Sequence, residues 1–422
     1  MTPQEISLLL YNIALIPVMI VSILFLFITL LSIFFDDPIR SKKKDQKSKD
    51  LPFITVQVPS FNDVIAAKCV DACLKLDYPK NKFEIMIVDD STDKNTQKIL
   101  KAYQKKHPGF VKYVHRTNRD GYKPGALRDA MHLVKGEFIV IFDADFVPPK
   151  EFLRKIIVPF DDPKVAVVQG RQTFLNKDVN LVSKFASFLL RMHHSVVMPL
   201  NNKINSVFFC GTAGAIRKSA LLEVGGWNAD SITEDTDLSI KLLAKGYKNV
   251  YMKIEVPSEV PVTVESFIKQ QARWTYGNMR AFIDHSKSIF FSRNLTIKQR
   301  TMITFLTCSA LIGPMVVIMT LAGFSGWFFG EPQLFELAQL QEFFIKFLYT
   351  AGFALMAIVM LYREKSLREF PNFILGSISL SIVLCVANTV VLYKAIFMKN
   401  KSLYANKSSW IVTPKQGNSD FK

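Results

Sequence analysis

The feature of this sequence that most constrains its fold is a long, uncharged, apolar stretch near the N-terminus. Residues 7–35 contain no charged side chain, and an apolar helix of this length can cross a bilayer with some tilt. No basic region precedes the stretch and it is too long for a signal peptide, so we expect a retained membrane helix. Further apolar segments come late, at 301–330, 343–362 and 370–393. The chain is therefore expected to be an integral membrane protein with a long, more polar middle region.

The distribution of basic residues predicts how the chain sits in the membrane. The formal net charge is +17, and basic residues cluster beside apolar segments, as in "IRSKKKDQKSKD" (39–50) and "REKSLRE" (363–369). This placement is typical of cytoplasmic flanks that face anionic headgroups. We therefore expect the N-terminus outside and the middle region in the cytosol, at the plasma membrane or an equivalent membrane. No nucleic-acid-binding module accompanies the charge, so no nucleic acid is expected as a partner.

The five cysteines give no sign of a disulfide or a zinc site. They show no paired spacing of the kind that binds zinc, and they lie mostly in apolar surroundings. We expect free thiols in a reducing compartment at Cys69, Cys73, Cys210, Cys308 and Cys385.

The middle region alternates between short β-rich runs and helical patterns. This order predicts an α/β fold with a mostly parallel sheet, which binds ligands at the carboxyl ends of its strands. The β-rich runs lie at 53–59, 83–91, 110–116, 136–145 and 165–170, with helical patterns at 63–76 and 94–106.

Two of the predicted strands end in pairs of acids, which often serve only as turn or helix-capping residues. The run "IVDDS" gives Asp89 and Asp90, and "FDADF" gives Asp143 and Asp145. In the second pair, alternation places both carboxylates on the same side of an extended segment, where they repel unless a cation lies between them. Mg²⁺ or Mn²⁺ holding a diphosphate would meet that need, because these ions prefer carboxylates together with phosphate oxygens.

A third group of acids opens the helical pattern "SITEDTDLSIKLLAKGY" (231–247). Glu234, Asp235 and Asp237 lie within four residues. Acids suit a helix N-terminus, where Ser231 or Thr233 can act as the cap. On this segment alone, a structural role is the simpler interpretation.

Several motifs occur in order between residues 58 and 274. They are "VPSFND", "VDDSTD", "GYKPGALRDAM", "FDADFVP", "FFCGTAGAIRKSAL", "GGWN", "TEDTDLSIKL" and "QQARW". Together they resemble the inverting family 2 glycosyltransferases, particularly the membrane-embedded branch with cellulose synthases, plant mannan and glucomannan synthase-like enzymes and hyaluronan synthases. The resemblance implies a Rossmann-like GT-A domain that binds a nucleotide sugar and is inserted between transmembrane helices.

The resemblance also implies roles for residues at matching positions. Asp143 and Asp145 would be the metal and diphosphate pair, and Asp235 would be the general base. An inverting transfer needs a base, because the acceptor hydroxyl must lose its proton in a single in-line displacement while the metal stabilises the departing diphosphate. Glu234, near the acceptor, and Asp237 would mainly cap and orient. The resemblance also implies that the nucleotide sugar is contacted by Asp63, Asp89, Asp90 and Lys123. It implies that the acceptor is contacted by Phe209, Cys210, Gly211 and Thr212.

The motif "QQARW" places Gln270, Arg273 and Trp274 within one turn of a helix, on a shared face. A surface helix with a half-buried tryptophan is the structural alternative. An indole is a good stacking surface for a sugar, however, and Arg and Gln can bind diphosphate or hydroxyls. The resemblance assigns Gln270 and Arg273 to the nucleotide sugar and Trp274 to the acceptor.

The tail sequence "WIVTPKQG" (410–417) resembles the gating loop of cellulose synthases. The match would put Thr413 and Lys415 over the bound nucleotide, with Lys415 facing phosphate. We therefore expect the tail to lie in the cytosol.

These assignments predict the domain organisation. With the N-terminus outside and the tail in the cytosol, 301–330 and 343–362 would span the membrane, whereas the more polar 370–397 would form a re-entrant or interfacial helix. A full span by 370–397 is the competing topology. The expected units are an N-terminal transmembrane helix (1–40), a cytosolic GT-A domain (41–279), an amphipathic interfacial helix (280–298), C-terminal membrane helices with the interfacial segment (299–398) and a cytosolic tail (399–422).

Two functions of different classes fit these observations, and the occupied motif positions argue against a non-catalytic scaffold or transporter. A processive synthase would extend a β-linked glucan or mannan, which the Q-Q-x-R-W and gating-loop matches favour. A glycolipid synthase would add one or a few sugars to a membrane lipid, which the short membrane portion favours.

The resemblance favours a uridine diphosphate sugar over guanosine diphosphate mannose as donor. In larger polymer synthases further helices follow the gating loop, whereas this sequence ends at Lys422, which leaves room for an accessory subunit.

Overall fold

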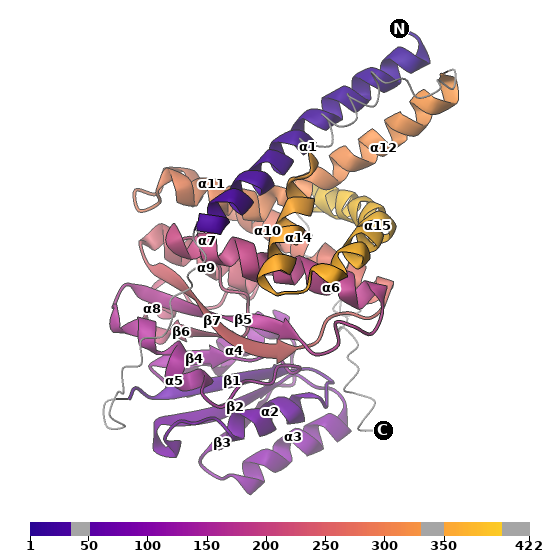
Figure 1. Cartoon of the computed structure of the whole chain (residues 1–422). Helices are drawn as coiled ribbons and strands as arrows, with labels where there is room; N and C mark the ends of the chain where they lie inside the picture. Colours follow the sequence, from indigo (N-terminus) through magenta and orange to yellow (C-terminus); the bar gives the residue numbers. More distant parts are fainter. Residues whose placement is uncertain (35–50, 331–349, 399–422) are drawn as a thin grey trace.

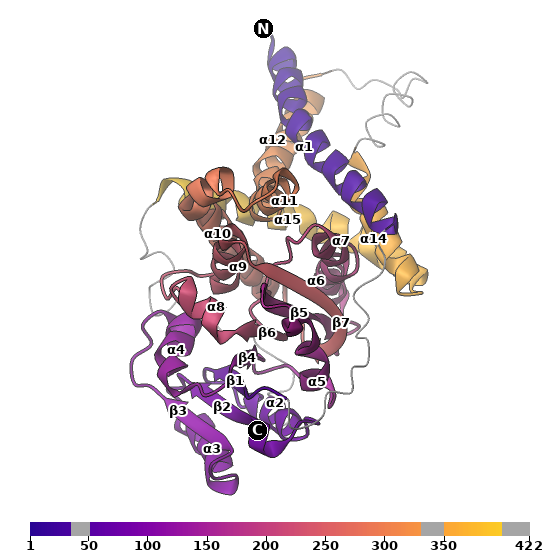
Figure 2. The ribbon, with the colours of Figure 1, turned by 90° about the vertical axis from the view of Figure 1, so that its left-hand side faces the viewer.

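The computed structural model describes residues 1–34, 51–330 and 350–398. Figure 1 shows a sheet with its covering helices in the lower part of the molecule and a group of longer helices above it. Two of the long helices, α1 (Pro3–Phe34) and α12 (Ile312–Phe329), lie side by side although they are far apart in the sequence (Figures 1 and 2). The chain thus folds as an α/β unit flanked by long apolar helices, which confirms the predicted fold class.

A seven-stranded sheet forms the centre of the α/β unit, with the strand order β3-β2-β1-β4-β6-β5-β7. Strand β6 pairs antiparallel with β4 and β5, and the other neighbouring strands pair parallel. The prediction of a mostly parallel sheet is therefore confirmed. The strands are β1 (Ile54–Ser60), β2 (Phe83–Asp89), β3 (Val111–His115), β4 (Phe138–Ile141), β5 (Val165–Phe174), β6 (Gly214–Arg217) and β7 (Lys248–Ser258).

Hydrophobic layers on both faces of the sheet explain why the central strands read as continuous apolar runs. Every residue of β1, β2 and β4 is buried, as expected for parallel strands that helices cover on both sides. The neighbouring residues Ile85 and Met86 belong to different buried clusters, one with Val56 and the other with Ile139. This alternation follows from the two-residue period of a strand.

Shorter helices cover the sheet and connect it to the upper part. Helix α3 begins after Asp93, whose carboxylate accepts hydrogen bonds from the N–H groups of Asn95 and Thr96, and its bounds match the predicted segment 94–106. The helices of this part are α2 (Ala66–Leu74), α3 (Lys94–Lys106), α4 (Tyr122–Ala130), α5 (Phe152–Ile156), α6 (Leu181–Met192), α7 (Met198–Lys203), α8 (Lys218–Glu223) and α9 (Glu234–Lys245), with a π-helix, η5 (His193–Val197), between α6 and α7.

Three helical segments of the described chain are long and apolar enough to cross a membrane: Pro3–Phe34, Ile297–Phe329 and Leu367–Phe397. The second joins α11 (Ile297–Cys308) to α12, and the third consists mainly of α15 (Phe370–Phe397). Helix α14 (Gly352–Arg363) is shorter and lies at the end of the segment that the sequence predicts as a span. These apolar helices indicate an integral membrane protein.

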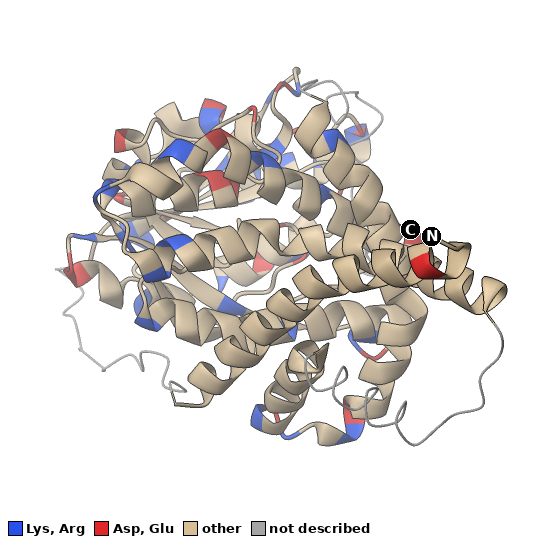
Figure 3. Ribbon diagram, turned by 90° about the horizontal axis from the view of Figure 1, so that it is seen from above, with Lys and Arg blue, Asp and Glu red and all other residues tan. Residues whose placement is uncertain are grey.

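The arrangement of the apolar helices bears on the two topologies. In Figure 2, α15 lies crosswise to α1 and α12, and it packs against α6. This direction agrees with an interfacial helix, while its length and composition agree with a span, so both topologies stay predictions. In Figure 3, the ribbon positions of charged residues are frequent on the α/β part and sparse along the long apolar helices.

Helix α10 joins the two parts of the molecule. It is a single helix of 28 residues, Val264–Phe291, so the predicted boundary between 279 and 280 falls inside it. A separate interfacial helix over 280–298 is not formed, because 280–291 continues α10 and α11 begins at Ile297. Gly277 lets α10 approach α9 closely, since a Cβ there would lie 2.3 Å from Thr233 Cγ2.

Candidate active site

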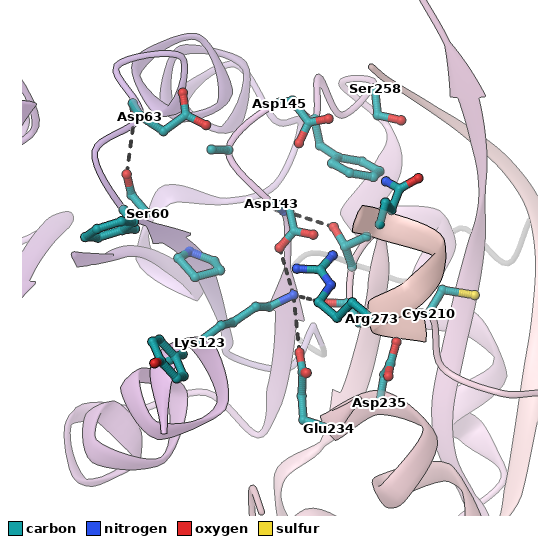
Figure 4. A pocket seen from close by; sticks show the side chains of 18 of the residues that line it. Ser60, Asp63, Lys123, Asp143, Asp145, Cys210, Glu234, Asp235, Ser258 and Arg273 are labelled. Atoms are coloured by element: carbon teal, nitrogen blue, oxygen red, sulfur yellow. Dashed lines mark hydrogen bonds and ion pairs between the residues drawn. The ribbon is translucent and has the colours of Figure 1, made fainter. Parts of the chain in front are cut away.

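A cavity of about 260 Å³ lies between the carboxyl ends of β1 and β4 and the helices α4, α9 and α10 (Figure 4). This is the edge at which open α/β sheets bind their ligands. The predicted site residues that line the cavity are Asp63, Asp90, Lys123, Asp143, Asp145, Cys210, Gly211, Thr212, Glu234, Asp235, Gln270, Arg273 and Trp274.

The two acids of "FDADF" lie just beyond the end of β4. The N–H of Asp143 donates to Thr212 Oγ1 (2.9 Å), and its Oδ1 lies 2.8 Å from Lys123 Nζ in an ion pair. Asp145 is nearly buried, and its Oδ2 accepts a hydrogen bond from the N–H of Glu259 (3.1 Å). Both residues line the same cavity, but they lie in the turn after β4 and not in the extended segment that the sequence predicts.

Lys123, at the start of α4, connects the acids beyond β4 with the acids of α9. Its Nζ lies 3.4 Å from Glu234 Oε1 and donates to the carbonyl of Gly211 (3.0 Å), in addition to the ion pair with Asp143 (Figure 4). Burial lowers the pKa of Lys123, but Asp143 and then Glu234 outweigh burial and raise this pKa above its ordinary value. Lys123 therefore stays charged and offsets negative charge in the cavity.

Asp235 lies in the first turn of α9 and faces the cavity. Burial, followed by the negative charge of Glu234, raises the pKa of Asp235 to about 7 against the opposing effect of Lys123. Its Oδ1 accepts a hydrogen bond from the N–H of Thr236 (2.8 Å). A carboxylate whose pKa lies near neutrality is ionised yet basic at physiological pH, which suits a general base.

The backbone at Gly211 brings the "FFCGT" loop close to Asp235. Gly211 has φ +76°, and a Cβ at this position would lie 3.1 Å from Asp235 Oδ2, so glycine is needed for both conformation and space. The buried side chain of Gln169 fixes the loop. Its Oε1 accepts from the N–H of Cys210 (2.8 Å), and its Nε2 donates to the carbonyl of Thr212 (2.9 Å).

The third acid of the helix start, Asp237, points away from the cavity toward His285 and Lys241. It is buried and does not line the cavity; its carboxylate lies 2.8 Å from His285 Nε2 and 2.6 Å from Lys241 Nζ. Burial raises the pKa of Asp237, but the hydrogen bonds from His285 and Lys241 outweigh burial and lower it. Thr233 occupies the N-cap position without a capping hydrogen bond from its side chain.

The two acids of "VDDS" have different environments. Asp90 lines the cavity, and Arg116 donates to its carboxylate from Nε (2.6 Å) and Nη2 (2.7 Å). Asp89 is fully buried outside the cavity, where it accepts hydrogen bonds from Ser91 Oγ (2.5 Å) and the Tyr113 hydroxyl (2.7 Å). Asp89 therefore does not reach the cavity in which the sequence predicts its contact with the nucleotide sugar. Its oxygens instead hold the ends of β2 and β3 together.

The first half of α10 presents its predicted residues to the cavity. Gln270, Arg273 and Trp274 all line it, and Gln270 Oε1 is buried with no hydrogen-bond partner in the described part of the chain. Phe209, predicted to touch the acceptor, is instead buried in the core against the sheet and does not line the cavity. Thr413 and Lys415 of the predicted gating loop lie outside the described residues.

Two charged residues that the sequence analysis did not single out, Arg119 and Glu259, also line the cavity. The guanidinium carbon of Arg119 lies 3.3 Å from the ring centre of Phe61 and 5.3 Å from that of Tyr122. Glu259, at the turn after β7, is the second. Arg119 lies two positions before Gly121, the first residue of the "GYK" motif, and this proximity is the signal that could have found it. Glu259 belongs to no motif.

The acids of the cavity fit a divalent metal whose coordination is completed by substrate. Within residues 1–34, 51–330 and 350–398, no group of three or more His, Cys, Asp or Glu side chains could hold a metal alone. Mg²⁺, however, is often held by one or two carboxylates together with substrate phosphates and water. Asp143 and Asp145 supply such a pair, and carboxylate oxygens suit Mg²⁺ and Mn²⁺.

A comparison with protein families bears directly on this site. The family "Glycosyl transferase family group 2" matches residues 138–363, more than half of the 422 residues. The chain belongs to this family. The match covers the D-x-D acids, the "FFCGT" loop, α9 and α10. It therefore includes most of the residues that line the cavity.

Two plant relatives of this glycosyltransferase are similar over about 60% of its length. It is 33% identical over 261 residues to glucomannan 4-β-mannosyltransferase 7 of Arabidopsis thaliana. This alignment covers 59% of this chain and 47% of that protein. It is 34% identical over 272 residues to glucomannan 4-β-mannosyltransferase 1 of Oryza sativa subsp. japonica, covering 62% and 52%. The chain thus spans about half the length of the curated relatives it matches.

A solved structure extends the similarity to nearly the whole chain. The mannosyltransferase PcManGT from Pyrobaculum calidifontis, in complex with GDP-Man and Mn²⁺, aligns with a TM-score of 0.64 at 18% identity. The alignment covers 94% of this chain and 100% of the archaeal one. At this identity the likeness shows a shared fold, a GT-A-like sheet flanked by long apolar helices.

Proposed function

We propose that this glycosyltransferase moves mannose from guanosine diphosphate mannose to a hydroxyl of a β-linked glycan at the membrane, with inversion at the anomeric carbon. The observation that carries the proposal is the environment of Asp235. A carboxylate with a pKa of about 7 lines the same cavity as the D-x-D acids. A base for the acceptor and a site for the diphosphate are the two parts that such a transfer requires.

In the proposed reaction, Asp235 removes the proton of the acceptor hydroxyl as its oxygen attacks the anomeric carbon. The new glycosidic C–O bond forms while the C–O bond to the diphosphate breaks, and the nucleoside diphosphate leaves with the bonding electron pair. The proton stays on Asp235 until it passes to solvent. Attack from the face opposite the leaving group inverts the configuration, so one base is sufficient.

The other residues of the cavity would bind and orient the two substrates. Lys123 and Arg273 would face the diphosphate, since both are cations that line the cavity. Trp274 and the loop at Gly211 would hold the acceptor sugar, which places the hydroxyl near Asp235. Gln270 Oε1, buried and without a described partner, would accept a hydrogen bond from a sugar hydroxyl.

A divalent metal fits the acids beyond β4. Asp145 would bind Mg²⁺ or Mn²⁺ together with Asp143, which already faces the cation of Lys123. When bound, the ion would neutralise charge on the departing diphosphate. The Mn²⁺ bound with GDP-Man in the archaeal mannosyltransferase supports this assignment.

The similar proteins support a mannosyl donor and weigh against the uridine diphosphate sugar that the sequence favoured. The plant relatives are mannosyltransferases by name, and the archaeal structure contains GDP-Man. In this chain, Arg119 stacks on Phe61 in the same cavity as Asp90. An arginine can donate to the O6 and N7 acceptors of guanine, and a carboxylate can accept from its N–H groups.

A membrane lipid is the second candidate acceptor. The wall of the cavity includes Phe174, Leu190 and Ile232, and α6, which carries Leu190, packs against α15. This apolar side would suit a lipid-linked sugar. The plant relatives and the motif at Gln270 to Trp274 support the glycan acceptor more strongly.

The function is tested with membranes that contain the protein, Mn²⁺ and a panel of radiolabelled sugar nucleotides. We expect label from guanosine diphosphate mannose in an insoluble product that a β-mannanase digests. Label confined to the organic phase would establish the glycolipid alternative, and incorporation only from uridine diphosphate sugars would refute the proposed donor. Membranes with the Asp235→Asn variant provide the background.

The raised pKa of Asp235 predicts a pH dependence of the transfer. Because the base must be ionised, kcat/KM for the acceptor should fall roughly tenfold for each pH unit below about 7 and level off above it. The measurement is the initial rate between about pH 5 and pH 9, at fixed free Mn²⁺. A rate that stays constant down to pH 5 would contradict the assignment of Asp235 as the base.

A further inference from the structure

A second cavity, of about 380 Å³, lies apart from the active site. It is formed by β5, β7, η5 and the residues at the end of α14. Arg171 of β5 lines this cavity, whereas the next residue, Gln172, lines the active site. Successive side chains of a strand point to opposite faces, so the two cavities lie on opposite sides of β5 and share no lining residue.

The second cavity lies at the level where two apolar helices end. α1 ends at Phe34 and α14 at Arg363. The guanidinium of Arg363 donates to the carbonyl of Ser32 in the last turn of α1 (2.6 Å) and to the carbonyl of Ser195 in η5 (2.6 Å). Tyr362, beside it, is 72% exposed. Exposed tyrosine and basic residues at the ends of apolar helices are typical of the headgroup level of a membrane.

The lining of this cavity carries an excess of positive charge. Arg171, Lys253, Arg363 and Lys365 line the cavity together with one acid, Glu364, while Glu255 lies beside the lining at 3.8 Å from Arg171. Glu364 is already paired with Arg171. The ammonium groups of Lys253 and Lys365 have no ion-pair partner in the described part of the chain. Two cations thus remain for an anion that enters the cavity.

The inner wall also carries two buried nitrogen atoms without a hydrogen-bond partner among the described residues. They are Nε of Arg171 and Nδ1 of His194, and both residues line the cavity. His194 is 1% exposed and lies in the π-helix η5, a distortion that is frequent at functional sites. An unpaired buried donor costs free energy, so a ligand oxygen beside the Nε–H of Arg171 would remove that cost.

We propose that this cavity binds the phosphate-bearing headgroup of an anionic phospholipid. Lys253 and Lys365 would hold the phosphate oxygens, the Nε–H of Arg171 on the inner wall would donate to a polar group of the headgroup, and Tyr362 would lie at the lipid interface. A lipid is favoured over a soluble phosphate because the cavity lies at the ends of α1 and α14. The inference does not depend on which sugar the enzyme transfers.

The test measures phospholipid binding to the full-length protein in a neutral detergent by native mass spectrometry. The Lys253→Gln/Lys365→Gln variant should bind phosphatidylglycerol roughly 30-fold more weakly than the wild type, because each lysine at a membrane surface contributes a several-fold gain in affinity for anionic lipid. Phosphatidylcholine should bind weakly to both proteins. The melting temperature of the variant in detergent alone should equal that of the wild type, since neither ammonium group has a described partner.

The matched control removes two lysines far from the cavity. Lys98 and Lys101 are exposed on α3, at the end of the molecule remote from the apolar helices (Figure 1). Lys98→Gln/Lys101→Gln should leave phosphatidylglycerol affinity within about twofold, because charges this distant are screened by salt. An equal loss of phosphatidylglycerol affinity in both double variants would mean that the affinity depends only on net charge. This result would overturn the proposed site. Displacement of phosphatidylglycerol by inorganic phosphate at equal concentration would overturn the lipid as its ligand.

Discussion

Replacing Asp235 with asparagine is expected to lower kcat by roughly 10²- to 10⁴-fold and to leave the affinity for guanosine diphosphate within about twofold. The amide has the shape of the carboxyl group and its oxygen can still accept the hydrogen bond from the N–H of Thr236. It cannot accept the proton of the acceptor hydroxyl. The measurements are initial rates with radiolabelled donor and calorimetric titration of guanosine diphosphate in the presence of Mn²⁺.

The pKa of Asp235 also fixes the sign of the stability change in this variant. A folded-state pKa of about 7 exceeds the unfolded value of about 4, so ionisation of Asp235 destabilises the fold as pH rises through this interval. Asparagine does not ionise. The melting temperature of Asp235→Asn relative to wild type should therefore increase from about pH 5 to pH 8, which separates loss of the base from loss of the fold.

Asp237 provides the matched control on the same helix turn. Asp237→Asn removes a buried charge that lies 2.8 Å from His285 Nε2 and 2.6 Å from Lys241 Nζ. The variant should melt at a lower temperature, because the two partners lose their carboxylate. Its kcat in the folded fraction should fall far less than that of Asp235→Asn. A larger loss of kcat in Asp237→Asn than in Asp235→Asn would mean that Asp235 is not the base.

Replacing Asp145 with asparagine should weaken the binding of guanosine diphosphate roughly 10- to 100-fold when Mn²⁺ is present. The amide oxygen can still accept the hydrogen bond from the N–H of Glu259, so the loop after β4 should keep its position. The negative charge next to the proposed sites of the metal and the diphosphate is lost. Calorimetric titration with and without Mn²⁺ measures the effect directly.

Removal of the metal is the control for this second variant. With excess EDTA, the wild-type affinity should fall to that of Asp145→Asn, and the variant should not weaken further. An affinity difference that persists unchanged in EDTA would mean that Asp145 acts on the nucleotide without a metal. Equal nucleotide affinity of both proteins in Mn²⁺ would remove Asp145 from the donor site altogether.

The main features of the sheet were predictable because its parallel strands are apolar runs separated by turn residues. β1 to β5 fall within or across the predicted segments, whereas β6 and β7 were missed. β6 has only four residues, Gly214–Arg217, and is stabilised by its pairing with β4 and β5. No local sequence pattern predicts so short a strand. β7 alternates buried and exposed residues over part of its length, so its signal was present in the sequence.

The candidate site was predictable where one motif carries both position and chemistry. Asp143, Asp145 and Asp235 line one cavity as expected, because strand ends and helix starts place their side chains locally. The ion pair between Lys123 and Asp143 joins residues of different motifs, so no spacing rule could find it. The same limit explains Asp89, whose hydrogen bond with Tyr113 across two strands makes it structural.

The course of α10 sets a limit on how this enzyme can be divided. The helix carries Gln270 and Trp274 at the cavity and, further along, His285, which binds Asp237, two residues from the proposed base. A soluble fragment truncated after residue 279 would lose this histidine and leave the buried carboxylate of Asp237 with one hydrogen-bond partner fewer. A fragment that keeps the acids of α9 in their observed surroundings would therefore have to extend through α10 to Phe291, the helix that also packs against α15.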